Sequence, residues 1–127
     1  MKFNIHGKNI DVTDAIKDYV DLVRPSIQEM SNSTLTMNLE LRGKSFVYVC
    51  TYIDTYPESS FGVMAEAIDN VLSSNSSIYS NLLAEMKKID SNSKSVIVEY
   101  YNGDGSLIFS KEFIDWFFSW MFPTFLI

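Results

Sequence analysis

The chain has 127 residues and a formal net charge of −6, with 46% hydrophobic and 20% charged residues. This length and composition predict one globular domain spanning residues 1–127 and argue against wholesale disorder. Nucleic-acid-binding proteins normally carry an excess of Lys and Arg. The acidic balance therefore argues against binding through bulk attraction to phosphate.

Few side chains are suited to metal binding or nucleophilic chemistry. One cysteine, Cys50, excludes an internal disulfide framework and a cysteine-cluster metal site, and we interpret it as a small buried hydrophobic residue. One histidine, His6, argues against a histidine-based metal site or catalytic triad. The sequence contains none of the motifs G-x-x-x-x-G-K-[ST], G-x-S-x-G or H-E-x-x-H. We therefore expect a protein that is not an enzyme, with no catalytic residues, no metal and no cofactor.

The N-terminal segment bears on the compartment. Its sequence, MKFNIHG, lacks the apolar core of a secretory signal peptide. Together with the single cysteine, this favours a reducing, cytoplasmic location.

The first part of the chain predicts a strand and a helix. Residues 2–6 alternate polar and apolar side chains, as in an amphipathic strand, and Gly7 permits a turn. Thr13 is the expected N-cap of a helix that ends at residues 31–33, and Pro25 predicts a kink or a restart within it. The helix has helical spacing of apolar residues, which predicts a buried stripe of Ile16, Tyr19, Val20, Val23, Ile27 and Met30.

The middle of the chain predicts a β-hairpin followed by a second helical region. Residues 34–42 alternate in polarity, and residues 46–53 are rich in β-branched and aromatic side chains. Residues 54–60 are interpreted as either a loop or a short edge strand. From residue 61 to residue 89 apolar residues recur every three or four positions, which predicts a helix. The serine-rich run at residues 73–77 leaves the continuity of that helix open.

A second hairpin completes the predicted sheet. Residues 96–101 and 107–109 flank an Asn-Gly-Asp-Gly turn at residues 102–105. The elements predict an α+β fold in the order β-α-β-β-α, with helices packed on one face of a mixed or antiparallel sheet. A C-terminal hairpin and an aromatic helix, within residues 95–127, extend this fold.

The C-terminal segment is almost entirely apolar, reading FIDWFFSWMFPTFLI over residues 113–127. We expect a helix capped by Ser110, running to about residue 121 and stopped by Pro123. The segment is too short, and Asp115 too central, for a membrane-spanning helix. Three interpretations stay open: a core helix, an interface for a partner or a second copy, and peripheral attachment to a membrane.

The two sides of this expected helix have different predicted roles. Phe113, Trp116 and Trp120 form one row, which we expect to face the sheet. Phe118 and Phe122 form the opposite row. They are the candidate residues for a partner interface or for contact in a homo-oligomer.

Two segments carry a family resemblance. Residues 1–20, MKFNIHGKNIDVTDAIKDYV, combine a strand, a glycine turn and the start of a threonine-capped helix. Residues 64–69, MAEAID, are similar to the entry of a second helix. In this order and separation, the two segments resemble the bacterial ribosome hibernation-promoting factors.

The resemblance implies a β-α-β-β-β-α unit over residues 1–90, which needs a short third strand around residues 53–56. It also implies binding to RNA of the small ribosomal subunit at its decoding centre, and a block of translation in stress or stationary phase. The helices of that family carry basic residues that contact ribosomal RNA. The RNA-binding residues implied here are Lys17, Arg24, Lys87 and Lys88.

Local charge favours an alternative function. Asp14, Asp18 and Asp21 surround Lys17 and Arg24 along the first helix, and affinity for phosphate falls steeply as basic contacts are lost. The alternative is a small acidic protein-interaction or inhibitor protein, of a kind that mobile elements encode. Such a protein would keep the scaffold without the RNA-binding surface.

Overall fold

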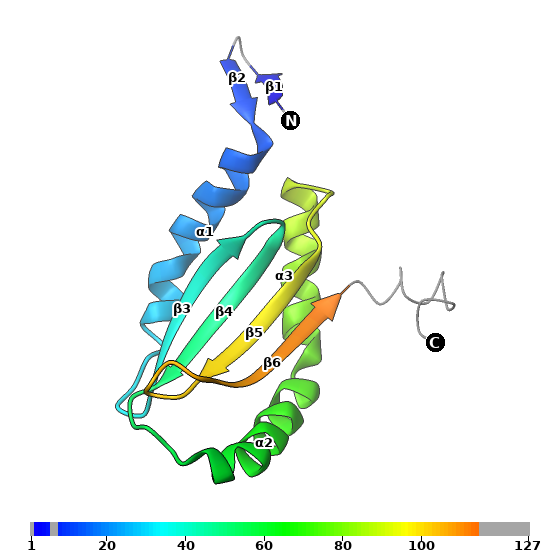
Figure 1. The fold of residues 1–127 in the computed structure, drawn as a ribbon. Helices are drawn as coiled ribbons and strands as arrows, with labels where there is room; N and C mark the ends of the chain where they lie inside the picture. Colours follow the sequence, from blue (N-terminus) through cyan, green and yellow to red (C-terminus); the bar gives the residue numbers. More distant parts are fainter. Residues whose placement is uncertain (1, 6–7, 115–127) are drawn as a thin grey trace, which may run out of the picture.

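The computed structural model describes residues 2–5 and 8–114, with side chains from Ala15 onward (Figure 1). It contains a four-stranded mixed sheet, a separate two-stranded hairpin and three α-helices. In chain order the elements are β1 (Lys2–Ile5), β2 (Lys8–Asp11), α1 (Val12–Gln28), β3 (Leu35–Arg42), β4 (Ser45–Tyr52), a 3-10 turn (Glu58–Ser60), α2 (Phe61–Ser74), α3 (Ser76–Ile89), β5 (Ser95–Tyr101) and β6 (Leu107–Ile114).

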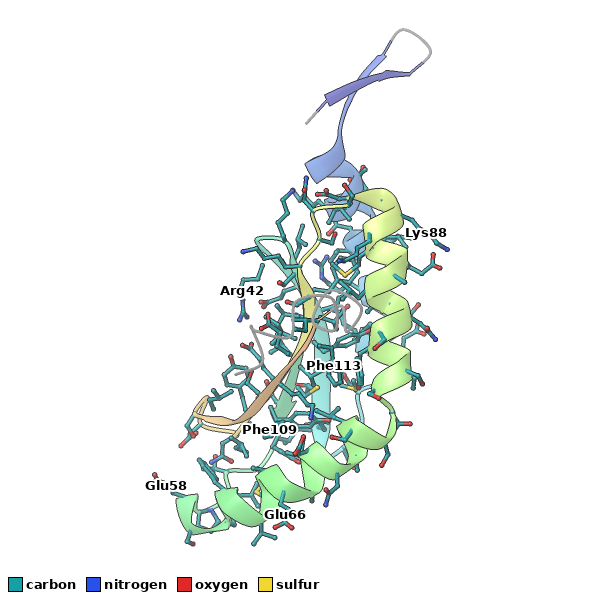
Figure 2. The ribbon with its side chains drawn as sticks, turned by 90° about the vertical axis from the view of Figure 1, so that its right-hand side faces the viewer. Arg42, Glu58, Glu66, Lys88, Phe109 and Phe113 are labelled. Atoms are coloured by element: carbon teal, nitrogen blue, oxygen red, sulfur yellow. The ribbon has the colours of Figure 1, made fainter. Side chains whose placement is uncertain are left out.

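The main sheet has the strand order β3-β4-β5-β6. Its two hairpins, β3 with β4 and β5 with β6, are antiparallel, whereas β4 and β5 pair in parallel. The parallel pair requires a crossover connection, which α2 and α3 provide. All three helices lie on one face of this sheet, so the α+β prediction is confirmed (Figures 1 and 2).

The core lies between the helices and that face. Leu39 of β3, Phe46 of β4 and Val96 of β5 are fully buried, and Ile16 and Val20 of α1 pack in the same cluster. Tyr19 stacks on Phe46 with ring centroids 5.9 Å apart. The apolar stripe predicted for α1 therefore faces the core over most of its length, although its last member, Met30, is 58% exposed.

The ends of α1 differ from expectation. The helix begins at Val12, directly after β2, so Thr13 lies inside the first turn and the prediction that it is the N-cap is wrong. The helix also continues through Pro25 without a restart. Pro25 is exposed, so its ring points away from the core, and its carbonyl accepts the Glu29 N–H at 2.9 Å. Helical hydrogen bonding therefore resumes immediately after the proline.

The predicted helix over residues 61–89 is two helices that meet at Asn75. The Asn75 side chain donates to the Val71 carbonyl at 2.8 Å, and the Ser74 hydroxyl donates to the Asn70 carbonyl at 2.8 Å. Short polar side chains thus take up carbonyls that would otherwise serve the helix, which explains the break in the serine-rich run.

No strand forms at residues 53–56, so the third strand implied by the family resemblance is wrong. The chain instead leaves the sheet and is held by the turn after β5. The Asn102 side chain, 1% exposed, accepts the Tyr56 N–H at 2.8 Å and donates to the Tyr56 carbonyl at 2.9 Å. A Cβ on Gly103 would lie 2.7 Å from the Asp54 carbonyl oxygen, so glycine is required at this close approach.

The last strand is longer than predicted. β6 runs to Ile114, so Ser110 lies within a strand and is not the N-cap of a helix. Phe113 pairs with Val96 and is buried in the sheet, stacked on Tyr79 of α3 at 4.6 Å. The other residues of the aromatic rows lie outside the described residues: Trp116, Phe118, Trp120 and Phe122.

Candidate functional site

A pocket opens between α1 and α3, which lie side by side over the sheet (Figure 1). Its volume is about 270 Å³. Both helices and three strands contribute to its walls, and the lining residues are Ile27 and Met30 from the α1 side, Met37, Tyr48, Cys50, Val98 and Tyr100 from the sheet, and Ile78 and Tyr79 from α3.

The floor of the pocket is buried and its mouth is apolar. Cys50 and Val98 are 1% and 2% exposed, whereas Met30 and Ile78 are each 58% exposed. The ring of Tyr79 contacts that of Tyr48 edge-on at 5.7 Å, in addition to its stacking on Phe113. These contacts hold the aromatic wall in place, while the exposed side chains offer apolar surface beyond the opening.

The titratable groups of the pocket are held neutral. Burial raises the pKa of Tyr48 to about 12 and that of the Cys50 thiol to about 11. Burial also raises the pKa of Tyr79 and of Tyr100. Because the thiolate is the nucleophilic form, Cys50 is poorly suited to covalent chemistry. The nine lining residues carry no charged side chain, so the arrangement suits apolar groups that can also meet a neutral hydroxyl.

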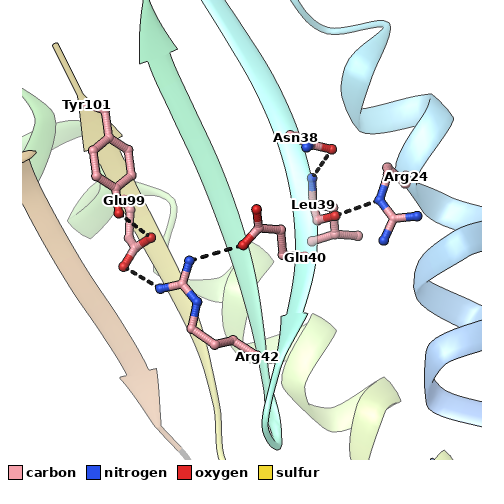
Figure 3. A network of polar contacts seen from close by, with 7 residues as sticks. All are labelled: Arg24, Asn38, Leu39, Glu40, Arg42, Glu99 and Tyr101. Carbon is pink, nitrogen blue, oxygen red and sulfur yellow. Dashed lines mark hydrogen bonds and ion pairs between the residues drawn. The ribbon is translucent and has the colours of Figure 1, made fainter. Parts of the chain in front are cut away.

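The four residues implied to bind RNA are only partly brought together. Lys17, near the start of α1, and Lys87 and Lys88, near the end of α3, lie toward the same end of the helical layer (Figure 1). Arg24 is engaged within the fold. Its Nε donates to the Leu39 carbonyl at 2.8 Å (Figure 3). Its Nη1 bonds Asp21 at 2.7 Å. Lys88 forms an ion pair with Glu85 at 2.9 Å.

The opposite face of the sheet carries a polar network that the sequence interpretation missed. Arg42 of β3 bonds Glu99 of β5 at 2.9 Å and Glu40 at 3.1 Å, and the Tyr101 hydroxyl donates to Glu99 at 2.8 Å (Figure 3). The strand alternation does place these residues on the face away from Leu39. Alternation within each strand does not reveal that β3 and β5 both pair with β4. That arrangement of the strands is what brings Arg42 and Glu99 together.

A second hollow, of about 370 Å³, lies beside the turn after β5. Its polar groups serve the fold, because Asn102 binds the Tyr56 backbone and Asp104 accepts from the Ser106 N–H and hydroxyl. Across residues 2–5 and 8–114, no three His, Cys, Asp or Glu side chains gather as a metal site. None of the helices in that part of the chain is both long and apolar enough to cross a membrane.

The fold and pocket define a small α+β protein with an apolar recess under two helices. Residues 12–113 match the family described as Domain of unknown function (DUF4854), and the chain belongs to that family. A crystal structure from Pseudomonas aeruginosa, described as a "putative secreted protein", is similar with a TM-score of 0.58 and 8% sequence identity. The match covers 81% of this chain and 88% of that chain, and it shows a shared fold alone. No curated protein matches the chain.

These findings overturn the resemblance to the hibernation-promoting factors. The family match spans residues 12–113, whereas the resemblance rested mainly on residues 1–20. In the structure the first strand pairs only with β2 and does not join the main sheet. The strand, glycine turn and helix start of residues 1–20 therefore do not place the chain among the hibernation-promoting factors.

Proposed function

We propose that this chain is a non-enzymatic protein-interaction module, and that the pocket between α1 and α3 receives an apolar side chain of a protein partner. The observation that carries the proposal is the combination of a neutral, closely packed floor with a mouth formed by the exposed Met30 and Ile78. Large apolar side chains inserted into such recesses commonly dominate the energy of protein interfaces.

The apolar surface around the mouth favours a protein partner over a separate small molecule. The pocket volume of about 270 Å³ is close to the lower end of the range for small-molecule sites, about 300–1,000 Å³, so the volume is compatible with either kind of ligand. Met30 is also an adaptable side chain, of a type that lines surfaces able to repack around a partner. A protein partner would bury the apolar surface around the mouth of the pocket, whereas a small ligand would leave that surface exposed to water.

The same features support binding rather than catalysis. The raised pKa of the Cys50 thiol and of the tyrosines removes the charged forms that nucleophilic or acid-base catalysis uses at neutral pH. The family resemblance that implied ribosome binding is wrong. Two of the four residues it implied to bind RNA, Arg24 and Lys88, already have carboxylate partners. Ribosome binding and a cytoplasmic location stay predictions.

Side-chain analogues test the proposal directly. Toluene, p-cresol and 3-methylindole reproduce the side chains of Phe, Tyr and Trp. Titrated into protein with ¹³C-labelled methionine methyl groups, they are expected to shift the Met30 and Met37 signals, because both residues line the pocket. Met64, which lies on α2 outside the pocket lining, serves as the internal reference.

A pair of equally exposed positions provides the matched control. Ile78→Glu places a charge at the mouth of the pocket and is expected to abolish the Met30 and Met37 shifts. Val71→Glu introduces the same charge on α2, at a side chain 60% exposed against 58% for Ile78, and is expected to leave the shifts unchanged. Equal shifts at Met64 and Met30, or equal effects of the two variants, would contradict the proposal.

A further inference from the structure

The stretches of chain that build the pocket contain no basic residue. Residues 25–41, 45–86 and 95–110 lack Lys, Arg and His. All nine residues that line the pocket come from these three stretches. The stretches do carry acidic residues, so their formal charge is negative. These acidic residues are Glu29, Glu40, Asp54, Glu58, Glu66, Asp69, Glu85, Glu99 and Asp104.

Basic residues at the borders of these stretches are paired within the fold. Arg24 bonds Asp21 at 2.7 Å, and Lys111 bonds Asp69 at 2.7 Å. Arg42 bonds two carboxylates on the face of the sheet away from the pocket. Several exposed carboxylates of the three stretches remain without an ion pair among the described residues. They are Glu29, Asp54, Glu58, Glu66 and Asp104.

The lysines of residues 12–114 other than Lys111 lie toward the opposite end of the sheet from these carboxylates. That end contains the start of α1, the turn between β3 and β4, and the connection from α3 to β5 (Figure 1). Figure 2 shows the separation, with Lys88 near one end and Glu58 and Glu66 near the other. The lysines at this end are Lys17, Lys44, Lys87, Lys88 and Lys94.

One of the unpaired carboxylates adjoins the mouth of the pocket. Glu29 directly precedes Met30, the lining residue that is 58% exposed, and is itself exposed. Its N–H bonds the Pro25 carbonyl at 2.9 Å, which fixes the backbone at this position. On the other side of the mouth, Lys87 lies about 14 Å along α3 from Ile78. A cation that arrives beside the pocket can therefore bind Glu29 without competition from a nearby lysine of α3.

We propose that the protein partner carries Lys or Arg directly beside the apolar residue that enters the pocket, and that this cation binds Glu29. The inference rests on the proposed function and adds the charge of the partner. The unpaired carboxylates and the net charge of −6 would attract a basic segment and repel an acidic one. For the same reason, two copies of this chain would not meet through this end, because like charges would face one another.

Three tripeptides with acetylated N-termini and amidated C-termini test the charge of the partner: Lys-Phe-Lys, Gln-Phe-Gln and Glu-Phe-Glu. Each is titrated into the full chain with ¹³C-labelled methionine methyl groups, and dissociation constants are taken from the Met30 and Met37 shifts. At about 20 mM salt we expect Lys-Phe-Lys to bind about threefold to tenfold more tightly than Gln-Phe-Gln, with Glu-Phe-Glu the weakest. The difference should shrink in about 0.5 M salt, because salt screens exposed charges.

Two variants locate the charge that the peptides detect. Glu29→Gln removes the carboxylate at the mouth and keeps the side-chain size. It is expected to reduce the preference for Lys-Phe-Lys over Gln-Phe-Gln by at least about twofold and to leave Gln-Phe-Gln binding unchanged. Glu66→Gln is the matched control, because it removes the same charge from an exposed position on α2, outside the pocket lining. It is expected to leave the preference in place.

The outcomes separate this proposal from the proposed function. Equal affinities of the three peptides, with shifts at Met30 and Met37, would overturn the basic partner and leave the pocket as an interaction site. Tighter binding of Glu-Phe-Glu, or equal effects of Glu29→Gln and Glu66→Gln, would also overturn it. No shift at Met30 or Met37 with any of the peptides would overturn both proposals, because the pocket would then not admit an apolar side chain.

Discussion

Arg42 on β3 and Glu99 on β5 form an ion pair of 2.9 Å across the intervening strand β4. The pair is asymmetric, because the Glu99 side chain is 12% exposed and the Arg42 side chain 50%. Residues far apart in sequence are thereby tied across three strands of the sheet. The Tyr101 hydroxyl also donates to Glu99, and this hydrogen bond raises the pKa of Tyr101.

Replacing the arginine should therefore destabilise the sheet. Arg42→Met keeps much of the apolar stem but leaves the nearly buried Glu99 without its cationic partner, and we expect a loss of about 1 kcal/mol in the free energy of unfolding. Urea denaturation measures this loss. Lys88→Met removes an exposed ion pair with Glu85 and is the control, with an expected loss of about 0.3 kcal/mol. Equal losses in the two variants would show that the cross-strand ion pair stabilises the fold no more than an exposed ion pair does.

Asn102 should be among the most sensitive polar positions. Its side chain is 1% exposed and satisfies both the N–H and the carbonyl of Tyr56. Asn102→Ala leaves two backbone groups without partners, so we expect a loss of about 2–3 kcal/mol in the free energy of unfolding. The exposed Asn92→Ala is the comparison, and thermal denaturation of both proteins distinguishes them. A change of less than about 0.5 kcal/mol for Asn102→Ala would contradict this account.

Acid stability should depend on Asp90. Lys44 lies 2.7 Å from its carboxylate and, with the Asn92 N–H, holds the pKa of Asp90 below its usual range. A carboxyl whose folded-state pKa is lowered stabilises the fold above its unfolded pKa of about 3.9. That stabilisation is lost as pH falls from the unfolded value through the lowered folded value.

Asp90→Asn should thus lower the urea midpoint at pH 7 and reduce the difference between the midpoints at pH 7 and pH 3. The exposed Asp54→Asn is the control and should retain the wild-type pH dependence. If the Asp90 variant loses stability equally at both pH values, its carboxylate charge is not what stabilises the fold.

The Cys50 thiol should be unreactive in the native protein. With a pKa of about 11, about one thiol in a thousand is ionised at pH 8, and the side chain is only 1% exposed. Alkylation by iodoacetamide at pH 8 should be at least about two orders of magnitude slower than in urea-unfolded protein. Mass spectrometry measures both rates. Rapid labelling of the folded protein would show that the pocket floor opens readily.

Local patterns predicted most of the sheet and little of what connects distant segments. Alternating polarity in residues 34–42 and β-branched and aromatic residues in 46–53 predicted the first hairpin, and the Asn-Gly-Asp-Gly turn predicted the second. The serine-rich run left the continuity of the helix open, and the structure has two helices that meet at Asn75. The N-cap predictions for Thr13 and Ser110 failed because strand pairing extends to Asp11 and Ile114, and pairing partners decide where a strand ends.

The site required long-range information. The pocket brings residues of α1, α3 and three strands together, and their spacing in sequence gives no sign of this. The exposed Met30 was predicted to be buried, because the apolar spacing of α1 continues in the sequence beyond Gln28, where the helix ends. Tyr48, Tyr79 and Tyr100 belong to no sequence motif that would indicate a shared pocket wall.

The most direct measurement for the proposed interaction site is a nuclear Overhauser experiment on the full chain with p-cresol, the side-chain analogue of tyrosine. The account predicts contacts from the ring protons of p-cresol to the methyl groups of Met30 and Ile78, at the mouth of the pocket. Contacts to Met64 or Val63 on α2, or no contacts at saturating p-cresol, would contradict the claim that the recess between α1 and α3 is the binding site.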